Sequence, residues 1–221
     1  MAVSQQSPRQ DRRRARTRLA LVEAGQGLFA DRDVDSVSVD EIAAAADVAK
    51  GTFYNYFTDK EELAQVVAAT VRGEVEAAIT GLTGSITDPA TRLALAVVSF
   101  LRYAHDRPDS ARVMLRLFAG ATATAAPVNQ RARSLIAQGF ASGRFRAPSE
   151  SAAILLLIGA VQAGMAHLLD HGSRATLIET AEGLCQLILH GLGVPAPTAT
   201  RIARNAVAAV FEGADSGGVP A

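Results

Sequence analysis

Tryptophan is absent from the 221 residues, and cysteine occurs only once, as Cys185. A single cysteine excludes an intrachain disulfide framework and a cysteine-rich zinc site, and it favours a reducing, cytoplasmic environment. Net charge is absent as well, because 22 Lys and Arg residues balance 22 Asp and Glu residues. No overall field therefore indicates a nucleic-acid partner, so such a partner would have to be recognised by a local cluster of charge.

Long apolar runs are also missing. The most apolar stretch, residues 152–169, is interrupted by two glycines, a glutamine and a histidine, whereas a membrane span needs roughly 20 consecutive apolar residues. The first residues include arginines but no apolar segment ending in a small-residue cleavage site, so no secretory signal is expected. We therefore expect a cytoplasmic protein without a membrane partner, in which residues 152–169 form a buried helix.

The alternation of polar and apolar residues that is typical of strands is nowhere sustained, and Ala and Leu dominate a chain that is 49% hydrophobic. Helical periodicity, with breaks at glycine and proline, predicts an all-α fold. The expected helices lie at about residues 12–30, 39–46, 50–57, 58–80, 90–105, 110–119, 128–140, 149–170, 174–190 and 197–211.

Arginine is concentrated near the N-terminus. Six arginines and one acidic residue, Asp11, lie between residues 9 and 18. This local excess of positive charge predicts a basic arm that could add phosphate or minor-groove contacts to a DNA-binding domain. A solubilising tail explains the same arginines equally well.

Residues 38–60 carry the most specific pattern in the chain. Ser38 and Glu41 have the spacing of a capping box, which satisfies free backbone N–H groups at the start of a helix. A turn at residues 47–49 separates this helix from a second one, in which Phe53 and Phe57 are four apart and bury one face. Two short helices that meet across three residues predict a helix-turn-helix.

The outward face of the second helix carries a cation, a hydroxyl, an amide and a phenol, at Lys50, Thr52, Asn55 and Tyr56. Such groups suit a DNA major groove, where amides and hydroxyls read base edges and cations hold phosphates. Lys60 adds a cation at the start of the next helix, where the helix N-terminus already favours an anion. The alternative is an amphipathic helix pair whose polar face is simply solvated.

Residues 38–43, Ser-Val-Asp-Glu-Ile-Ala, and residues 50–63, Lys-Gly-Thr-Phe-Tyr-Asn-Tyr-Phe-Thr-Asp-Lys-Glu-Glu-Leu, resemble the tetracycline-repressor (TetR) family. The resemblance is strong over about residues 14–65. It implies a dimeric DNA-binding transcription regulator in which Gly51 allows a close approach to double-stranded DNA, Tyr56 and Lys60 contact phosphates, and Thr52, Tyr54 and Asn55 lie nearer the bases. The side chains implied at the DNA are Ser38, Lys50, Thr52, Tyr54, Asn55, Tyr56 and Lys60.

The turn between the two helices departs from the family pattern. It commonly reads Gly-Val-Ser in the family and reads Asp47-Val48-Ala49 here. Ala49 cannot supply the serine hydroxyl, which removes support for one phosphate contact. Asp47 is a candidate to cap the second helix instead.

The resemblance also implies how the chain is divided. We expect a disordered basic arm over residues 1–11, a helix-turn-helix DNA-binding domain over 12–60, a helical regulatory and dimerisation domain over 61–212, and a flexible tail over 213–221. The regulatory region resembles the family only in the layout of its helices, since no signature residues mark it.

Several residues of the regulatory region combine apolar bulk with a few polar groups, as expected of a pocket for a small apolar or amphipathic effector. Ordinary core packing is the alternative for each of them. The candidates are Phe100, Tyr103, Met114, Phe118, Gln162, Met165 and His167.

The helices near 149–170 and 174–190 match the position of the family's dimerisation helices. A helix pair from each subunit would form a four-helix interface of a homodimer, and small residues would let the helices approach closely. The alternative is that these helices only build this chain's own core. The small residues are Ala152, Ala153, Gly159, Ala160, Ala163 and Gly164.

No group of residues indicates an enzyme, a metal site or a cofactor. Cys185 and His190 are five apart without a third group, and the four histidines lack metal-ligand spacing. No phosphate-binding glycine loop occurs, and the Asp-rich loop at residues 31–35 lacks the glycine and distal glutamate of a calcium site. We therefore predict a homodimeric repressor that a ligand releases from a palindromic operator. The alternatives are an activator, a ligand-blind repressor, or a small-molecule-binding or interaction protein on the same scaffold.

Overall fold

The computed structural model describes residues 8–117 and 129–215, and every regular element within them is a helix. The all-α fold that the sequence predicts is therefore confirmed. The elements are α1 (Pro8–Asp31), the 3-10 helix η1 (Val34–Ser36), α2 (Val39–Ala45), α3 (Lys50–Phe53), α4 (Lys60–Thr83), α5 (Pro89–Asp106), α6 (Pro108–Leu117), α7 (Gln130–Ala141), α8 (Glu150–His171), α9 (Arg174–Gly191) and α10 (Ala196–Asp215).

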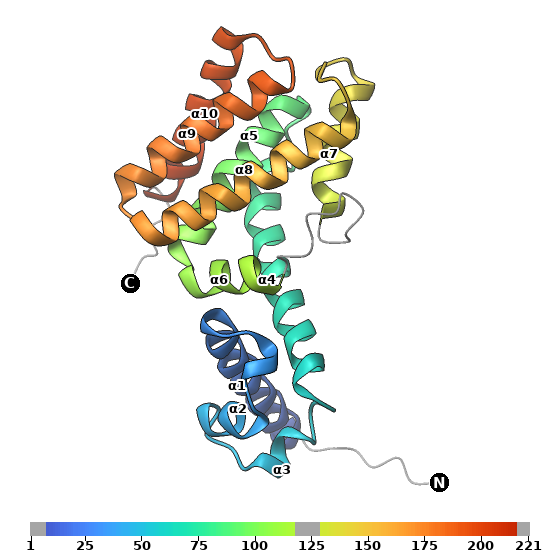
Figure 1. Cartoon of the computed structure of the whole chain (residues 1–221), viewed down its shortest axis with the longest axis vertical. Coiled ribbons are helices and arrows are strands. Elements are labelled where there is room, and N and C mark those ends of the chain that lie inside the picture. The colour runs from blue at the N-terminus through green and yellow to red at the C-terminus, as the bar shows by residue number, and fades with distance from the viewer. Residues whose placement is uncertain (1–7, 118–128, 216–221) are drawn as a thin grey trace.

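The helices form two parts that α4 joins (Figure 1). The head comprises α1, η1, α2, α3 and the first half of α4, and the body comprises the second half of α4 together with α5–α10. α6 forms a second bridge, because it packs against α1 of the head as well as against α4, α5 and α8. A shift of α4 or α6 in the body would therefore move the head.

Five helices begin where a serine or aspartate side chain caps the first turn. In each of them the side-chain oxygen accepts a hydrogen bond from a backbone N–H three residues later, which has no partner inside the helix. At α2 the cap is a complete capping box, because the Glu41 carboxylate accepts a bond from the Ser38 backbone N–H. The capping residues are Ser38, Asp59, Asp88, Ser149 and Ser173.

The core of the head is rich in phenylalanine. Phe29, Phe53 and Phe57 are at most 2% exposed, and the rings of Phe53 and Phe57 lie 5.7 Å apart between centroids. Ile42 from α2 and Leu63 from α4 are fully buried in the same apolar cluster. The aromatic pair predicted from four-residue spacing thus faces inward and fixes the short α3 against its neighbours.

The core of the body surrounds α5, which packs against α4, α6, α7, α8, α9 and α10. Leu93 and Leu101 of α5 are fully buried. At Gly164 of α8, a Cβ atom would lie 2.6 Å from Leu184 and 3.1 Å from Leu101, so α8 can approach α5 and α9 only without a side chain there. This glycine therefore serves packing within the chain.

Both ends of the described chain are more helical than expected. α1 begins at Pro8, so residues 8–11 of the expected disordered arm belong to a helix. α10 continues to Asp215, three residues into the expected tail. The expected end of the sixth helix, residues 118–119, lies outside the described residues.

α3 is shorter than expected, because it ends at Phe53 and not near Phe57. The backbone N–H groups of Asn55 and Tyr56 bond to carbonyl groups three residues earlier, at 3.1 and 2.9 Å, which tightens the chain into a turn. The Phe57 N–H bonds to the Phe53 carbonyl at 3.1 Å, so both rings still point to the same side.

Candidate nucleic-acid interface and internal cavity

Ser38 caps the start of α2. Its hydroxyl oxygen accepts from the Glu41 backbone N–H at 3.2 Å, and the hydroxyl donates to the Glu41 carboxylate at 2.8 Å. The hydrogen bonds from the backbone and hydroxyl of Ser38, together with the bond from Arg32, lower the pKa of Glu41 to about 2. Ser38 is exposed, so a DNA contact there would be additional to its capping role.

The turn after α2 explains why this position usually favours glycine. Asp47 has a φ of 54°, a left-handed conformation that costs a residue with a side chain roughly 1–2 kcal/mol. Its N–H bonds to the Ala44 carbonyl and the Val48 N–H to the Ala43 carbonyl, at 3.1 and 3.0 Å, which is a Schellman motif. Asp47 thus ends α2, and the expectation that it caps α3 is wrong. The N-cap of α3 is Ala49, which forms no side-chain hydrogen bond.

The predicted reading face consists of α3 and the turn that follows it. Tyr54 is 53% exposed and Asn55 is exposed, whereas Thr52 is half-buried. Lys50 is exposed and forms an ion pair with Asp40 of α2, with Nζ and Oδ2 2.8 Å apart. A Cβ atom on Gly51 would meet no protein atom within 4 Å, so the protein's own packing does not require glycine there.

Lys60 has a role that the sequence did not indicate. Its ammonium donates to the backbone carbonyls of Asp35 and Val37, at 2.9 and 3.1 Å, and the residue is half-buried. Lys60 therefore ties the first turn of α4 to η1. The cation lies at the start of the helix as expected, but two of its three N–H groups are used within the head.

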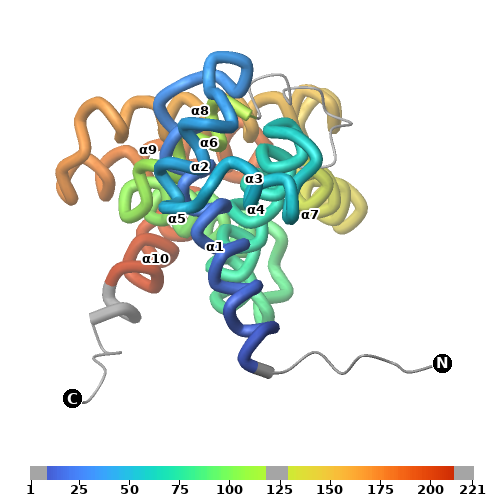
Figure 2. Tube along the Cα trace, turned by 90° about the horizontal axis from the view of Figure 1, so that it is seen from below, coloured from blue at the N-terminus to red at the C-terminus, as the bar shows by residue number. Residues whose placement is uncertain are grey.

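α1 brings arginines beside the reading face. The Arg14 guanidinium lies 5.9 Å from the Tyr56 ring centroid, and that of Arg18 lies 5.5 Å from the Phe57 centroid. The four-residue spacing of Arg14 and Arg18 on a helix is the signal that could have placed them on one face. Seen from below, α1, α2, α3 and the start of α4 are nearest to the viewer (Figure 2). These elements lie together at one end of the molecule.

Two polar contacts join α6 to α1. The Arg116 guanidinium donates to the Ala30 carbonyl at 3.0 Å, near the end of α1 where carbonyl groups lack helical partners. Gln26 of α1 donates to the Ser110 hydroxyl at 3.0 Å. The head is therefore held by α6 as well as by its covalent link to α4.

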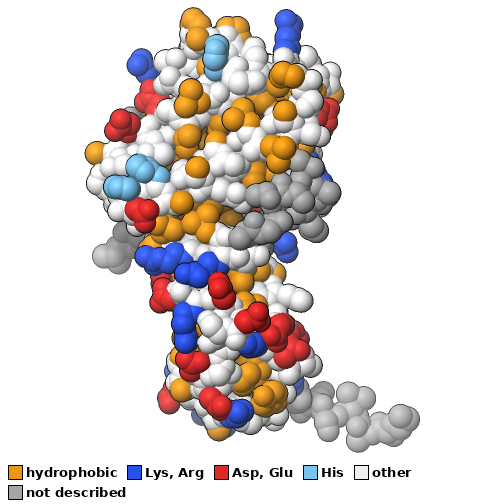
Figure 3. All heavy atoms as spheres, in the orientation of Figure 1, with side chains coloured by type: hydrophobic (Ala, Val, Ile, Leu, Met, Phe, Trp, Pro, Cys, Tyr) orange, Lys and Arg blue, Asp and Glu red, His pale blue; other side chains and the backbone are white. Residues whose placement is uncertain are grey.

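The outer face of α8 and α9 is apolar. Leu155, Leu156 and Leu187 are 51%, 40% and 68% exposed. Figure 3 shows hydrophobic side chains gathered across this part of the body, while charged side chains are more frequent lower down. We call the surface formed by these three leucines and the exposed small residues around them the α8/α9 face.

The six small residues predicted to let helices approach closely differ in exposure. Ala152, Gly159 and Ala163 are exposed, whereas Ala153 and Gly164 are buried within the chain and Ala160 is half-buried. One side of α8 therefore builds the chain's own core, and the other side is exposed within the described chain, so the dimer interface expected there stays a prediction.

By length and composition alone α8 could cross a membrane, with a mean hydropathy of 2.0 over its most apolar window. It packs, however, against α5, α6, α7 and α9. Only 39% of that window is buried inside the chain, so the helix that we expected to be buried is buried on one side only.

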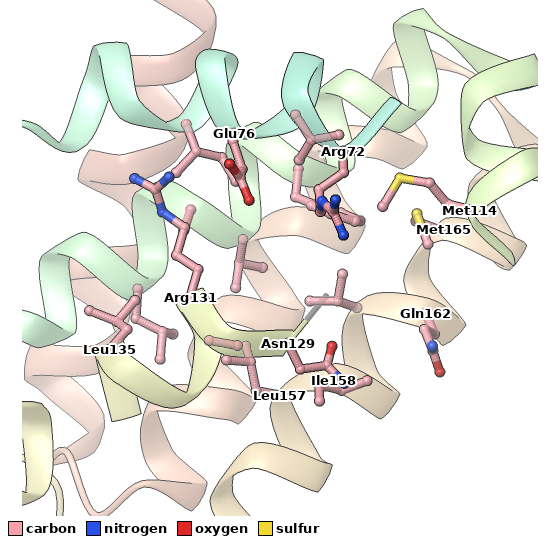
Figure 4. A pocket seen from close by; sticks show the side chains of 18 residues that line it. Arg72, Glu76, Met114, Asn129, Arg131, Leu135, Leu157, Ile158, Gln162 and Met165 are labelled. Atoms are coloured by element: carbon pink, nitrogen blue, oxygen red, sulfur yellow. The ribbon is translucent and has the colours of Figure 1, made fainter. Parts of the chain in front are cut away.

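A partly open cavity of about 180 Å³ lies in the body between α4, α5, α6, α7 and α8 (Figure 4). Of the seven predicted pocket residues, four border it: Phe100, Met114, Gln162 and Met165. Phe118 lies outside the described residues. The sequence did not identify Arg72, Glu76, Asn129 and Arg131, which also line the cavity. A signal was present on α4, where residues 72, 75, 76 and 79 have the spacing of one helix face.

The other two predicted pocket residues lie elsewhere. Tyr103 donates to the Glu74 carboxylate at 2.6 Å, and burial together with this bond raises the pKa of Tyr103 to about 12. His167 is exposed and stacks on His171, with 4.7 Å between ring centroids. His167 lies about 200° around the helix from Met165 and about 140° from Gln162, so it points away from the side of α8 that lines the cavity.

Cys185 is a core residue. It is fully buried, and burial raises the pKa of its thiol to about 12, so the reactive thiolate is strongly disfavoured. Among the residues that the structure describes, no three His, Cys, Asp or Glu side chains are grouped so that they could hold a metal ion.

Comparisons with known proteins agree with this arrangement. The model of the family of bacterial regulatory proteins, tetR family, matches residues 21–67, and that of the tetracyclin repressor-like C-terminal domain matches residues 88–205. An uncharacterised HTH-type transcriptional regulator of Mycobacterium tuberculosis is 31% identical over 96 residues, which are 42% of this chain and 48% of that protein. The chain thus spans about half the length of the curated relatives it matches.

Solved structures with the same fold include RolR and a gamma-butyrolactone receptor. RolR in complex with its ligand resorcinol is 27% identical, with a TM-score of 0.54 over 87% of this chain and 95% of that one. A gamma-butyrolactone receptor, described as ArpA-like, is 20% identical, with a TM-score of 0.67 over 90% and 99% of the two chains. The first family model matches residues of the head, and the second matches residues 88–205 of 221, which is more than half of the chain. This chain therefore belongs to the TetR family of bacterial regulatory proteins.

Proposed function

We propose that the protein is a ligand-responsive transcription repressor that binds DNA as a dimer in the bacterial cytoplasm. The observation that carries the proposal is the exposed face of α3 and its following turn. There Tyr54 and Asn55 face solvent, and Gly51 leaves room that the protein does not fill. Amide and phenol groups on a small protruding helix suit base edges in a major groove, and Gly51 would let the DNA backbone come close.

The α8/α9 face supports a second copy of the chain as partner. Three largely exposed leucines on two adjacent helices form a larger apolar surface than isolated surface residues would give. The exposed Gly159 and Ala163 let another helix approach closely. Two such faces would form a four-helix interface around a twofold axis, which presents two heads to a palindromic operator.

The cavity supports regulation by a small molecule. Its walls include α4 and α6, and these two helices connect the body to the head. A ligand that fits the cavity better when the heads are badly spaced for DNA would lower DNA affinity by that difference in binding. RolR, which resembles this chain over most of its length, has been crystallised with the small phenol resorcinol as its ligand.

Measuring the binding of the full chain to DNA that flanks its own gene, over a salt series, tests the proposal. We expect specific binding that weakens with salt as phosphate contacts release counterions. Asn55→Ala should cost about 1–3 kcal/mol on the specific site and little on unrelated DNA. Asn205→Ala, the same change at an exposed position on α10, is the matched control. Absence of specific binding at low salt would contradict the proposal.

A further inference from the structure

Three charged side chains that line the cavity have no polar partner among the residues that the structure describes. Arg72 and Glu76 of α4 and Arg131 of α7 all line it. None of the three side chains takes part in a hydrogen bond or ion pair within the described chain, although Arg72 is half-buried. Elsewhere in the body arginines bind carboxylates, such as Arg144 with Asp88 at 2.8 Å. A guanidinium at a cavity wall without a partner is therefore unusual for this protein.

The three charges are not equivalent. Figure 4 shows Glu76 and Arg131 turned toward each other, while Arg72 lies apart, on the side of the view where Met114 and Met165 are found. Two guanidinium groups and one carboxylate leave a net charge of +1 at the cavity. Glu76 and Arg131 are exposed and can be solvated, whereas Arg72 is half-buried, so Arg72 is the group whose charge most needs a partner.

The rest of the wall selects for an apolar body. Phe100, Met114, Leu157, Ile158 and Met165 surround the space, and a cavity of about 180 Å³ is small compared with pockets for drug-sized molecules. Methionine side chains adapt to irregular ligand shapes and contact aromatic rings favourably. A single ring or a short alkyl chain fits these walls better than a polar metabolite.

We propose that the effector is a small apolar monocarboxylate, whose carboxylate binds Arg72 and whose apolar part lies among the methionines. A guanidinium can hold a carboxylate through two parallel N–H···O bonds, and the low polarity of the wall strengthens them. The inference deepens the proposed function and rests on its assumption that the cavity receives the effector. A neutral phenol would leave the charge of Arg72 unmatched.

Arg72 lies where the binding of a carboxylate to its guanidinium can affect the head. It lies in the middle of α4, which begins at Lys60 in the head and ends at Thr83 in the body. Met114, on the same side of the cavity, belongs to α6, which holds α1 through Arg116. A carboxylate that draws Arg72 toward the methionines would therefore act on both helices that reach the head.

Matched acids and uncharged analogues test the proposal at pH 7 with the full chain. The probes are benzoate with benzamide, octanoate with octanamide, and resorcinol as a neutral phenol, each titrated by calorimetry and by thermal shift. We expect one of the acids to bind at least tenfold more tightly than its amide and than resorcinol. Arg72→Gln should weaken acid binding at least tenfold, and Arg72→Lys should restore part of it. Arg201→Gln, an exposed arginine on α10 outside the cavity, should leave acid binding unchanged.

Three results would overturn the proposal: an amide or resorcinol that binds as tightly as the acids, undiminished acid binding by Arg72→Gln, or no binding of either acid. The acid-to-amide ratio of the unmodified chain decides the question even if Arg72→Gln fails to fold. DNA binding is measured separately. Acid binding without DNA binding would refute the proposed function and leave this inference standing, whereas DNA binding without acid binding would do the reverse.

Discussion

The interiors of the head and the body differ in how completely they bury large side chains. In the head, Phe53 and Phe57 are almost completely buried with their rings 5.7 Å apart, and Phe29 is buried in the same apolar cluster. In the body, Phe100 and Met114 border a cavity of about 180 Å³. A filled core holds the surface above it in one shape, as the reading of bases requires. A cavity leaves room in which a small molecule can bind and shift the balance between conformations. The two parts thus differ in packing in the way that their proposed roles require.

Their outer surfaces differ as well. The head presents polar side chains such as Asn55 and Lys50 beside the arginines of α1, and the body presents Leu155, Leu156 and Leu187. A surface of the first kind suits a polyanion with polar base edges, and one of the second kind suits another apolar surface. The contrast between the two parts therefore extends from the interior to the partners that we propose.

Truncating a large aromatic side chain in each part should expose the difference in packing most strongly. Phe53→Ala leaves a hole in a filled core and should lower the free energy of unfolding by about 3–5 kcal/mol, with loss of DNA binding. Phe100→Ala only enlarges an existing cavity, and since Phe100 is half-buried the loss should be less than half as large. Urea unfolding followed by circular dichroism measures both. Equal losses would mean that the cavity does not weaken the packing of the body.

The α8/α9 face is the next place to test the comparison. Leu187→Arg places a charge in the proposed apolar interface, so the chain should become monomeric by analytical ultracentrifugation. Because two linked heads bind far better than one, operator affinity should fall by roughly 10²–10⁴-fold. Leu82→Arg, at an exposed leucine of α4 away from this face, is the control and should remain dimeric. A dimer that survives Leu187→Arg would contradict the proposed interface.

The head could be predicted from the sequence far better than the body, because its determinants are close together in the chain. The Ser38–Glu41 capping box, the Phe53–Phe57 pair and the start of α4 are all spacings of three or four residues. What failed was the conformation of Asp47, since a left-handed residue is visible only in the backbone. The engagement of Lys60 with η1 also escaped, because it joins residues more than twenty positions apart.

The cavity depends on contacts that no local pattern records. Four of the seven predicted residues line the cavity. The prediction succeeded for them because bulky apolar side chains with a few polar neighbours are typical of pockets. Tyr103 has the same composition signal, yet its hydroxyl binds Glu74 of a different helix. Arg72 was missed because an arginine in a long connecting helix looks like a solvated residue until five helices are brought together around it.

The smallest expected effects concern two carboxylates, one in each part, that hold the start of a helix. Asp88 caps α5 and binds Arg144 at 2.8 Å; burial raises its pKa, but the bonds from Arg144 and Thr91 outweigh this and lower it below the ordinary value of 3.8. Glu41 in the head has a pKa of about 2. A carboxylate whose pKa falls on folding stabilises the fold above its unfolded pKa and loses that effect as the pH falls through the folded value.

Asp88→Asn keeps a capping side chain but removes the charge, and with both partners of the pair partly exposed it should cost less than about 1 kcal/mol at pH 7. Glu41→Gln is the counterpart in the head. The difference from the unmodified chain should shrink for both variants as the pH is lowered, and for Glu41→Gln this should occur between pH 4.5 and about 2. Urea unfolding at a series of pH values measures the differences. Arg144 is 56 residues from Asp88, whereas Ser38 is only three residues from Glu41. A difference for Asp88→Asn that does not change with pH would show that Asp88 stabilises the body only as a helix cap and not through its charge on Arg144.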